Sequence, residues 1–130
     1  MIMASKPSVL IIDPDAFLAG IYARKFESDG WKVYVAESIP EGQKIIQKRK
    51  VSATVLEPEI DLIQSQVFME ELRQDPATVN LPIVVLSTLF DKKEIERMKR
   101  AGASAYLIKG HFVPTEAVRK VRGLLIKERG

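Results

Sequence analysis

Five short stretches of apolar, mostly β-branched residues recur along the chain, at residues 9–12, 33–35, 54–56, 83–86 and 106–108. Each stretch is too short for a helix, and none alternates between apolar and polar residues as a strand with one wet face does. Continuous apolar runs indicate strands that are covered on both faces, which is typical of a parallel sheet.

The segments between these runs carry apolar residues at helical spacing. The residues of the first such segment that are predicted to share one buried face are Phe17, Leu18, Ile21, Tyr22 and Phe26. Ser38 with Glu41, and Asp91 with Glu94, have the spacing of capping boxes that open two further helices. Pro114 suits the first turn of the last helix. Five strands therefore alternate with five helices.

This alternation predicts one α/β domain over residues 1–130, with a core at about 8–125 and tails at 1–7 and 126–130. The expected architecture is a doubly wound, flavodoxin-like (βα)5 fold. Its five-stranded parallel sheet is expected to have the strand order 2-1-3-4-5. The length of 130 residues also suits a single domain.

Composition narrows the protein class. The chain is 46% hydrophobic and 28% charged, and no apolar run reaches the roughly 18 residues of a membrane helix. The net charge of +3 is too small to indicate nucleic-acid binding by itself. There is no cysteine, which excludes disulfides and Cys-ligated metals. Without an apolar signal sequence at the start, we expect a cytoplasmic protein.

Candidate chemistry lies where the predicted strands end, because the working crevice of such folds is at that edge of the sheet. Asp13, Glu57, Ser87 and Lys109 each stand at such an end. Acids, a hydroxyl and an ammonium around one point indicate a site for Mg²⁺ and phosphate. The sequence has neither a Ser-His-Asp set nor a Gly-rich nucleotide loop, so we expect no enzyme activity.

Four motifs together resemble the receiver domain of bacterial two-component response regulators, over Ser8 to about Leu125. Residues 8–13 resemble its first strand with the terminal acid, and residues 53–57 resemble its third strand with the phospho-acceptor position. Residues 81–88 resemble its fourth strand with the hydroxyl residue. Residues 101–109 resemble its Gly-Ala-x-x-Tyr-Leu-x-Lys segment. The resemblance implies an acceptor at position 57, with Mg²⁺ beside it, and phosphoryl oxygens bound by Ser87 and Lys109. It also implies that Ser87 and Tyr106 form a switch pair.

The chain departs from the family at two residues on which the phosphoryl chemistry depends. The acceptor position is Glu57 rather than aspartate, and Pro14 stands where the family has a metal-binding acid. We therefore expect a degenerate, pseudo-receiver type in which Glu57 pairs with Lys109, either as a fixed mimic of the phosphoryl charge or as a relic of an abandoned site. We expect Asp13 to cap the first helix with Pro14 at its first position.

No cofactor is expected at this site. Any Mg²⁺ binding would be weak and would use the carboxylates of Asp13, Glu57 and Glu59.

The expected function is signalling by protein contact without aspartyl phosphorylation. One alternative is a phosphorylatable response regulator in a phosphorelay, and another, of a different class, is a flavodoxin-like enzyme or cofactor binder. The expected partner is a histidine kinase or an output protein, and formation of a homodimer is an open alternative. We expect binding to neither a membrane nor nucleic acid. The candidate partner face is cationic and comprises Lys93, Arg97, Arg100 and Arg122.

Overall fold

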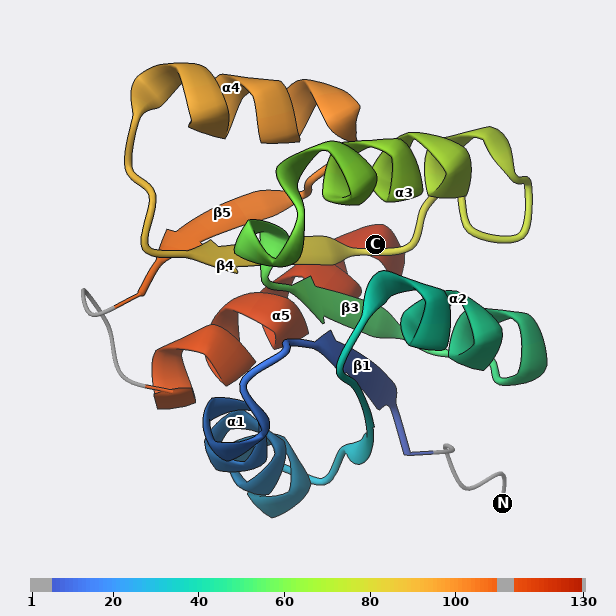
Figure 1. The fold of residues 1–130 in the computed structure, drawn as a ribbon. Helices are drawn as coiled ribbons and strands as arrows, with labels where there is room; N and C mark the ends of the chain where they lie inside the picture. The colour runs from blue at the N-terminus through green and yellow to red at the C-terminus, as the bar shows by residue number, and fades with distance from the viewer. Residues whose placement is uncertain (1–5, 110–113, 130) are drawn as a thin grey trace.

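The structure is a computed structural model, and it describes residues 6–109 and 114–129 (Figure 1). The strands are β1 (Ser8–Ile12), β2 (Lys32–Ala36), β3 (Ala53–Leu56), β4 (Ile83–Ser87) and β5 (Ala105–Ile108). The helices are α1 (Ala16–Ser28), α2 (Ile39–Lys48), α3 (Leu62–Gln74), α4 (Lys92–Ala101) and α5 (Pro114–Arg129), with a 3₁₀ turn η1 (Pro58–Ile60) before α3. The predicted alternation of strands and helices is confirmed.

The five strands form one parallel sheet in the order β2-β1-β3-β4-β5, as predicted. β1 pairs with β2 on one side and with β3 on the other, so the direction of winding reverses between β1 and β3. All strands of a parallel sheet end at the same edge. The loops that leave β1, β3, β4 and β5 therefore gather at that edge, beside the point where the winding reverses.

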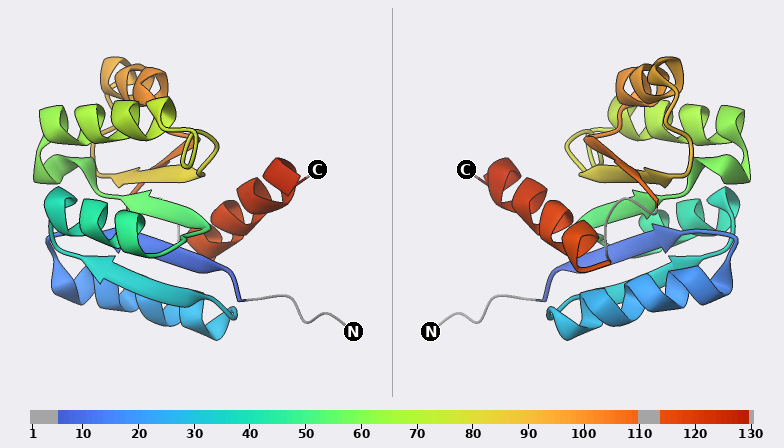
Figure 2. Two further views of the ribbon diagram at one scale, coloured as in Figure 1. Left: turned by 90° about the vertical axis from the view of Figure 1, so that its right-hand side faces the viewer. Right: turned by 90° about the vertical axis from the view of Figure 1, so that its left-hand side faces the viewer.

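Helices cover both faces of the sheet, so the core has two apolar layers (Figure 1). In β1, Val9 and Ile11 face α1 and α5, whereas Leu10 and Ile12 face α2, α3 and α4. Both sets of side chains are buried because each has a helix layer above it. The C-terminal end of α5 extends away from the sheet (Figure 2). Within the described chain, no helix combines the length and apolar character needed to cross a bilayer.

Two details of the predicted burial pattern are wrong. Phe17, in the first turn of α1, is 74% exposed, and Ala19 takes its place in the core beside Tyr22 and Phe26. The edge strands are also only partly covered, and Val35 of β2 is 44% exposed. Each edge strand has a neighbour on one side only, so the helix layers do not close over it as they do over β1, β3 and β4.

The predicted capping residues do begin their helices, with altered pairing. Ser38 Oγ accepts a hydrogen bond from the backbone N–H of Glu41 at 3.3 Å, while the Glu41 carboxylate accepts from the backbone N–H of Glu37 at 2.6 Å. The Asp91 carboxylate accepts from the backbone N–H of Lys93 at 3.0 Å and so caps α4. These caps satisfy N–H groups that have no partner inside a helix.

Candidate functional site

Four predicted site residues meet at the carboxyl edge of the sheet. The strand hydrogen bonding continues into this edge, because Glu57 N–H donates to the Ile12 carbonyl at 3.0 Å and Lys109 N–H donates to the Ser87 carbonyl at 2.7 Å. Asp13, Glu57 and Ser87 are all buried, with exposed fractions of 3%, 4% and 0%. The sheet therefore places two carboxylates and an ammonium in one cluster with little access to water, and the buried Ser87 hydroxyl lies at the same edge.

Lys109 binds the buried carboxylates. Its Nζ lies 2.5 Å from Glu57 Oε2 and 3.7 Å from Asp13 Oδ2, and its side chain is 17% exposed. The expected ion pair between Glu57 and Lys109 is thus present. A buried carboxylate without a cation would be costly, so a single lysine that reaches two of them stabilises the whole pocket.

Asp13 does not cap the first helix, as had been expected. Its Oδ1 accepts from the backbone N–H of Asp15 at 2.8 Å, and Asp15 is the residue that caps α1, accepting from Phe17 N–H at 3.0 Å and Leu18 N–H at 3.1 Å. The Asp13 backbone still donates to the Ala36 carbonyl of β2, so the chain cannot turn into a helix there. Asp13 is consequently left facing Lys109.

Glu57 is held at both carboxylate oxygens. Oε1 accepts from the backbone N–H of Glu59 at 2.7 Å and Oε2 meets Lys109. Burial raises the pKa of Glu57 to about 7, although the Lys109 ammonium and the Glu59 N–H act in the opposite direction. Burial also acts to lower the pKa of Lys109, but Glu57 outweighs it and the net pKa is raised. Glu57 therefore titrates near neutral pH, and its ion pair with Lys109 is complete only at higher pH.

Glu59 binds a residue that the sequence analysis did not single out. Its Oε1 accepts from the Thr88 hydroxyl at 2.6 Å, and its Oε2 accepts from the Thr88 backbone N–H at 3.3 Å. Burial acts to raise the pKa of Glu59, but the Thr88 hydroxyl and the Glu57 contact outweigh it and the net pKa is lowered. The predicted strand order places β3 beside β4, so the loops that follow them leave the sheet side by side. That adjacency is the signal by which the sequence could have indicated this contact.

Ser87 and Tyr106, the expected switch pair, both bind Leu89 in the loop after β4. Ser87 Oγ accepts from the Leu89 N–H at 3.0 Å, and the Tyr106 hydroxyl donates to the Leu89 carbonyl at 2.8 Å. Tyr106 is half-buried, and burial raises its pKa despite the opposing effect of the Ser87 hydroxyl. The two side chains are thus joined through one loop residue, and their role as a switch stays a prediction.

The pocket residues do not fit the Mg²⁺ ion that the family resemblance implies. Pro14 offers no side-chain oxygen, and the Lys109 ammonium already lies between Asp13 and Glu57. The third acid considered for the metal, Glu59, is turned to Thr88. Within residues 6–109 and 114–129, no group of three His, Cys, Asp or Glu side chains could hold a metal ion.

The four cations of the candidate partner face do not lie together. Lys93, Arg97 and Arg100 are exposed on α4, where Arg97 also forms an ion pair with Glu94 at 2.6 Å. Arg122 lies on the side of α5 that faces α1, and its guanidinium donates to the carboxylate and the carbonyl of Asp29, both at 2.9 Å. Because α1 and α4 cover opposite faces of the sheet, Arg122 is separate from the α4 cations.

Comparisons with known proteins show the family and the fold of the chain. The family model for the response regulator receiver domain matches residues 9–121. The phosphate regulon transcriptional regulatory protein PhoB of Pseudomonas aeruginosa is 25% identical over 91% of this chain. The receiver domain of the Francisella response regulator 1452 is 26% identical, with a TM-score of 0.80 over 94% of this chain and 98% of that one.

A CheY-like receiver domain from Methanospirillum hungatei has the same fold, with a TM-score of 0.86 and 18% identity over 96% of this chain and 98% of that one. The chain spans about half the length of the curated relatives that it matches first. The strand order, the residues at the strand ends and a family match over most of the sequence lead to one conclusion: this chain belongs to the response regulator receiver domain family.

Proposed function

We propose that this receiver domain signals by protein contact without being phosphorylated at position 57. The observation that carries the proposal is the buried ion pair between Glu57 and Lys109, at 2.5 Å. In the family that the sequence resembles, the lysine binds phosphoryl oxygens and the acceptor is an aspartate. Here the lysine already holds a carboxylate of the chain itself.

The added methylene of Glu57 argues against phosphoryl transfer. A reacting atom misplaced by about 1 Å can cost on the order of 100-fold in rate, and one methylene displaces the carboxylate by about that distance. Glu57 Oε2 lies against Lys109, the residue that the resemblance assigns to the incoming phosphoryl oxygens. The poor fit to Mg²⁺ also argues against phosphoryl transfer. A divalent ion is needed there to neutralise the charge that develops during the transfer.

The proposed partner surface is the cationic side of α4. Lys93 and Arg100 on α4 favour an acidic partner, such as a histidine kinase or an output protein.

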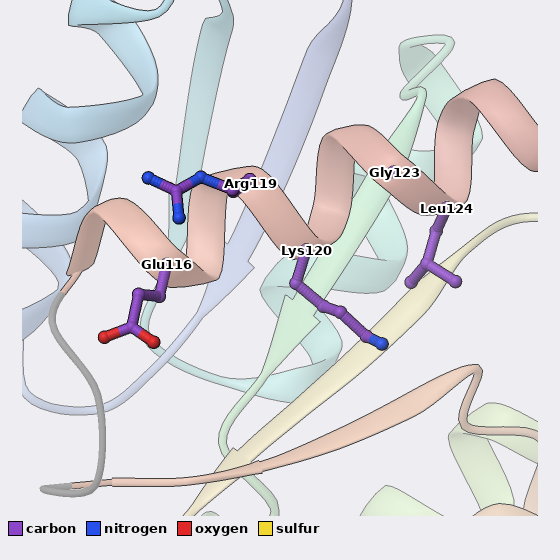
Figure 3. A pocket seen from close by; sticks show the side chains of 5 residues that line it. All are labelled: Glu116, Arg119, Lys120, Gly123 and Leu124. Carbon is purple, nitrogen blue, oxygen red and sulfur yellow. The ribbon is translucent and has the colours of Figure 1, made fainter.

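On α5, a pocket of about 370 Å³ is lined by Glu116, Arg119, Lys120, Gly123 and Leu124. Lys120 and Leu124 point to the side of α5 where β5 lies (Figure 3). An apolar and a cationic group side by side suit a contact with protein.

The test is an intact-mass measurement after incubation with acetyl phosphate and Mg²⁺. We expect the wild-type protein to gain no phosphoryl mass, because both the acceptor geometry and a metal-binding acid are altered. A stoichiometric, Mg²⁺-dependent gain that maps to Glu57 would overturn the proposal and favour the alternative of a phosphorylatable regulator in a phosphorelay.

The matched positive arm is the double variant Pro14→Asp with Glu57→Asp. The first change restores a metal-binding oxygen, and the second withdraws the carboxylate from Lys109. We expect the double variant to bind Mg²⁺ and to accept label, with much less label in either single variant, because metal and nucleophile act as a unit. A double variant that folds but does neither would show that the loop 58–62 has also lost the geometry, so the two substitutions alone would not explain the absence of labelling.

A further inference from the structure

We infer that Glu59 is a positioning residue that holds the loop between β4 and α4, and that Glu57 and Glu59 together occupy the contacts of one phosphoryl group. This loop comprises residues 88–91. The inference deepens the proposed function, on which its second half rests. The first half rests on the contact between Glu59 and Thr88 alone.

The two carboxylates divide the contacts between them. Glu57 takes the Lys109 ammonium at 2.5 Å, and Glu59 takes both the hydroxyl and the backbone N–H of Thr88, at 2.6 Å and 3.3 Å. The Glu59 N–H also donates to Glu57 at 2.7 Å, so the two carboxylates form one connected chain across the edge of the sheet. A lysine and a strand-end hydroxyl are the groups that, by the family resemblance, bind phosphoryl oxygens. The hydroxyl that contacts a carboxylate here is that of Thr88, the neighbour of Ser87, while Ser87 Oγ accepts from the Leu89 N–H.

The charge of the pair is close to that of a phosphoryl group. A single glutamate is a poor mimic, because a phosphoryl group carries roughly −1.5 to −2 at neutral pH. Glu59 is ionised at neutral pH, since its net pKa is lowered, and Glu57 adds up to one further charge as it ionises around its pKa of about 7. The sum lies in the range of the phosphoryl charge.

The contact with Glu59 completes the anchoring of the loop. Ser87 and Tyr106 hold Leu89 from β4 and β5, and Glu59 holds Thr88 from the β3 side. Hydrogen bonds to an ionised carboxylate are about twice as strong as those between neutral groups. Because α4 begins at Lys92, three residues after Leu89, the anchored loop also sets where α4 and its exposed cations lie.

The test is amide hydrogen exchange and amide chemical shifts of residues 87–91, measured by NMR without any phosphodonor. In Glu59→Gln we expect exchange at Thr88 to accelerate roughly tenfold and its amide proton to shift upfield, because a charge-assisted bond becomes a neutral one. The ring signals of Tyr106 should move as well, since the loop that its hydroxyl binds is loosened. Glu96→Gln, an equal loss of charge at an exposed site on α4, is the matched control and should leave these signals unchanged.

Two variants at the other end of the contact separate positioning from general stability. Thr88→Ser keeps the hydroxyl and should behave as wild type, whereas Thr88→Val should reproduce the effect of Glu59→Gln. Combining Glu59→Gln with Thr88→Val should add little to either change, because both weaken the same contact. The midpoint of urea unfolding should stay near the wild-type value in all of these variants.

The inference is wrong if Glu59→Gln resembles Glu96→Gln, or if Thr88→Val leaves the exchange at residue 88 unchanged. Either result would leave the labelling test of position 57 untouched. Conversely, phosphoryl label at Glu57 would end the proposed function and the charge-sharing half of the inference, while the loop measurement would still decide whether Glu59 positions Thr88.

Discussion

At the scale of single residues, the pocket is governed by how buried carboxylates are compensated. Asp13 and Glu57 are nearly inaccessible to water and share one ammonium. Glu59 lies outside this shielded space, where two donors from Thr88 suffice to favour its charged form. The pKa values of Glu57 and Glu59 are thus shifted in opposite directions, because their burial and their donors differ.

Glu57 should make stability depend on pH near neutrality. Its pKa in the folded protein is about 7, above the ordinary value of 4.5, so the folded state binds this proton more tightly than the unfolded chain does. The resulting stabilisation is complete below pH 4.5 and is lost as the pH rises through about 7. Relative to Glu57→Gln, the wild type should lose about 1 to 3 kcal/mol of unfolding free energy across this window.

This prediction is checked by urea unfolding of both proteins at a series of pH values between 4.5 and 8.5. The difference between the two curves isolates Glu57, because all other titrating groups are common to both proteins. Curves that run parallel over the whole range would contradict a raised pKa, because Glu57 would then lose its proton at the same pH in the folded and the unfolded protein.

At the scale of elements, close approach of a helix to the sheet depends on a missing side chain. α2 packs against β1 at Gly42, where an added Cβ would lie 2.5 Å from Cδ1 and 3.0 Å from Cγ1 of Ile12. Ile12 is fully buried, so its side chain cannot move aside into solvent. Gly20, in the middle of α1, presents the opposite case, because an added Cβ there would meet only the Arg24 guanidinium, at 4.0 Å.

The two glycines form a matched pair for mutation. Gly42→Ala should destabilise the protein by about 1 to 2 kcal/mol, because the cost of overpacking exceeds the gain in helix propensity. Gly20→Ala should stabilise it by about 0.5 to 1 kcal/mol through propensity alone. Urea unfolding of both variants measures the difference. A destabilised Gly20→Ala, or a neutral Gly42→Ala, would contradict the packing described here.

At the scale of the whole molecule, one cluster joins chain segments that are far apart in sequence. Arg122 of α5 binds the carboxylate and the carbonyl of Asp29, which ends α1, across 93 positions of sequence. Its guanidinium also lies 5.7 Å from the centre of the Trp31 ring, and Trp31 Nε1 donates to the same Asp29 carboxylate at 3.1 Å. Arg122 lowers the pKa of Asp29, as expected for a donor beside a carboxylate. Arg122 therefore holds α5 against the turn between α1 and β2.

Removing this cation should affect stability rather than binding. Arg122→Ala should cost about 1 kcal/mol of unfolding free energy, the sum of a partly exposed ion pair and a cation–π contact. Arg119→Ala, one turn earlier on α5 and exposed, should cost much less. Urea unfolding of the two variants distinguishes them. An equal loss of unfolding free energy in both would contradict a structural role for Arg122 and would favour its role in the candidate partner face.

Much of this protein can be predicted from its sequence alone. Each of the five strands is a continuous apolar run, the segments between them carry apolar residues at helical spacing, and two of them begin at a capping box, so local patterns were enough to predict the (βα)5 fold. The residues at the strand ends were predictable for the same reason, because a parallel sheet brings all of these ends to one edge. The pairing of Glu57 with Lys109 was also expected, because the family resemblance brings both positions to the same site at this edge.

Other contacts were decided only by the tertiary structure. Asp13 and Asp15 are equally good capping residues by type, and it was the hydrogen bond of Asp13 to β2 that left the cap to Asp15. The side of α5 on which Arg122 lies, and the reach of Glu59 to Thr88, depend on how helices and loops are placed against their neighbours. Sequence periodicity reports which face of an element is apolar, but it carries no information on which polar groups of different elements come within hydrogen-bonding distance.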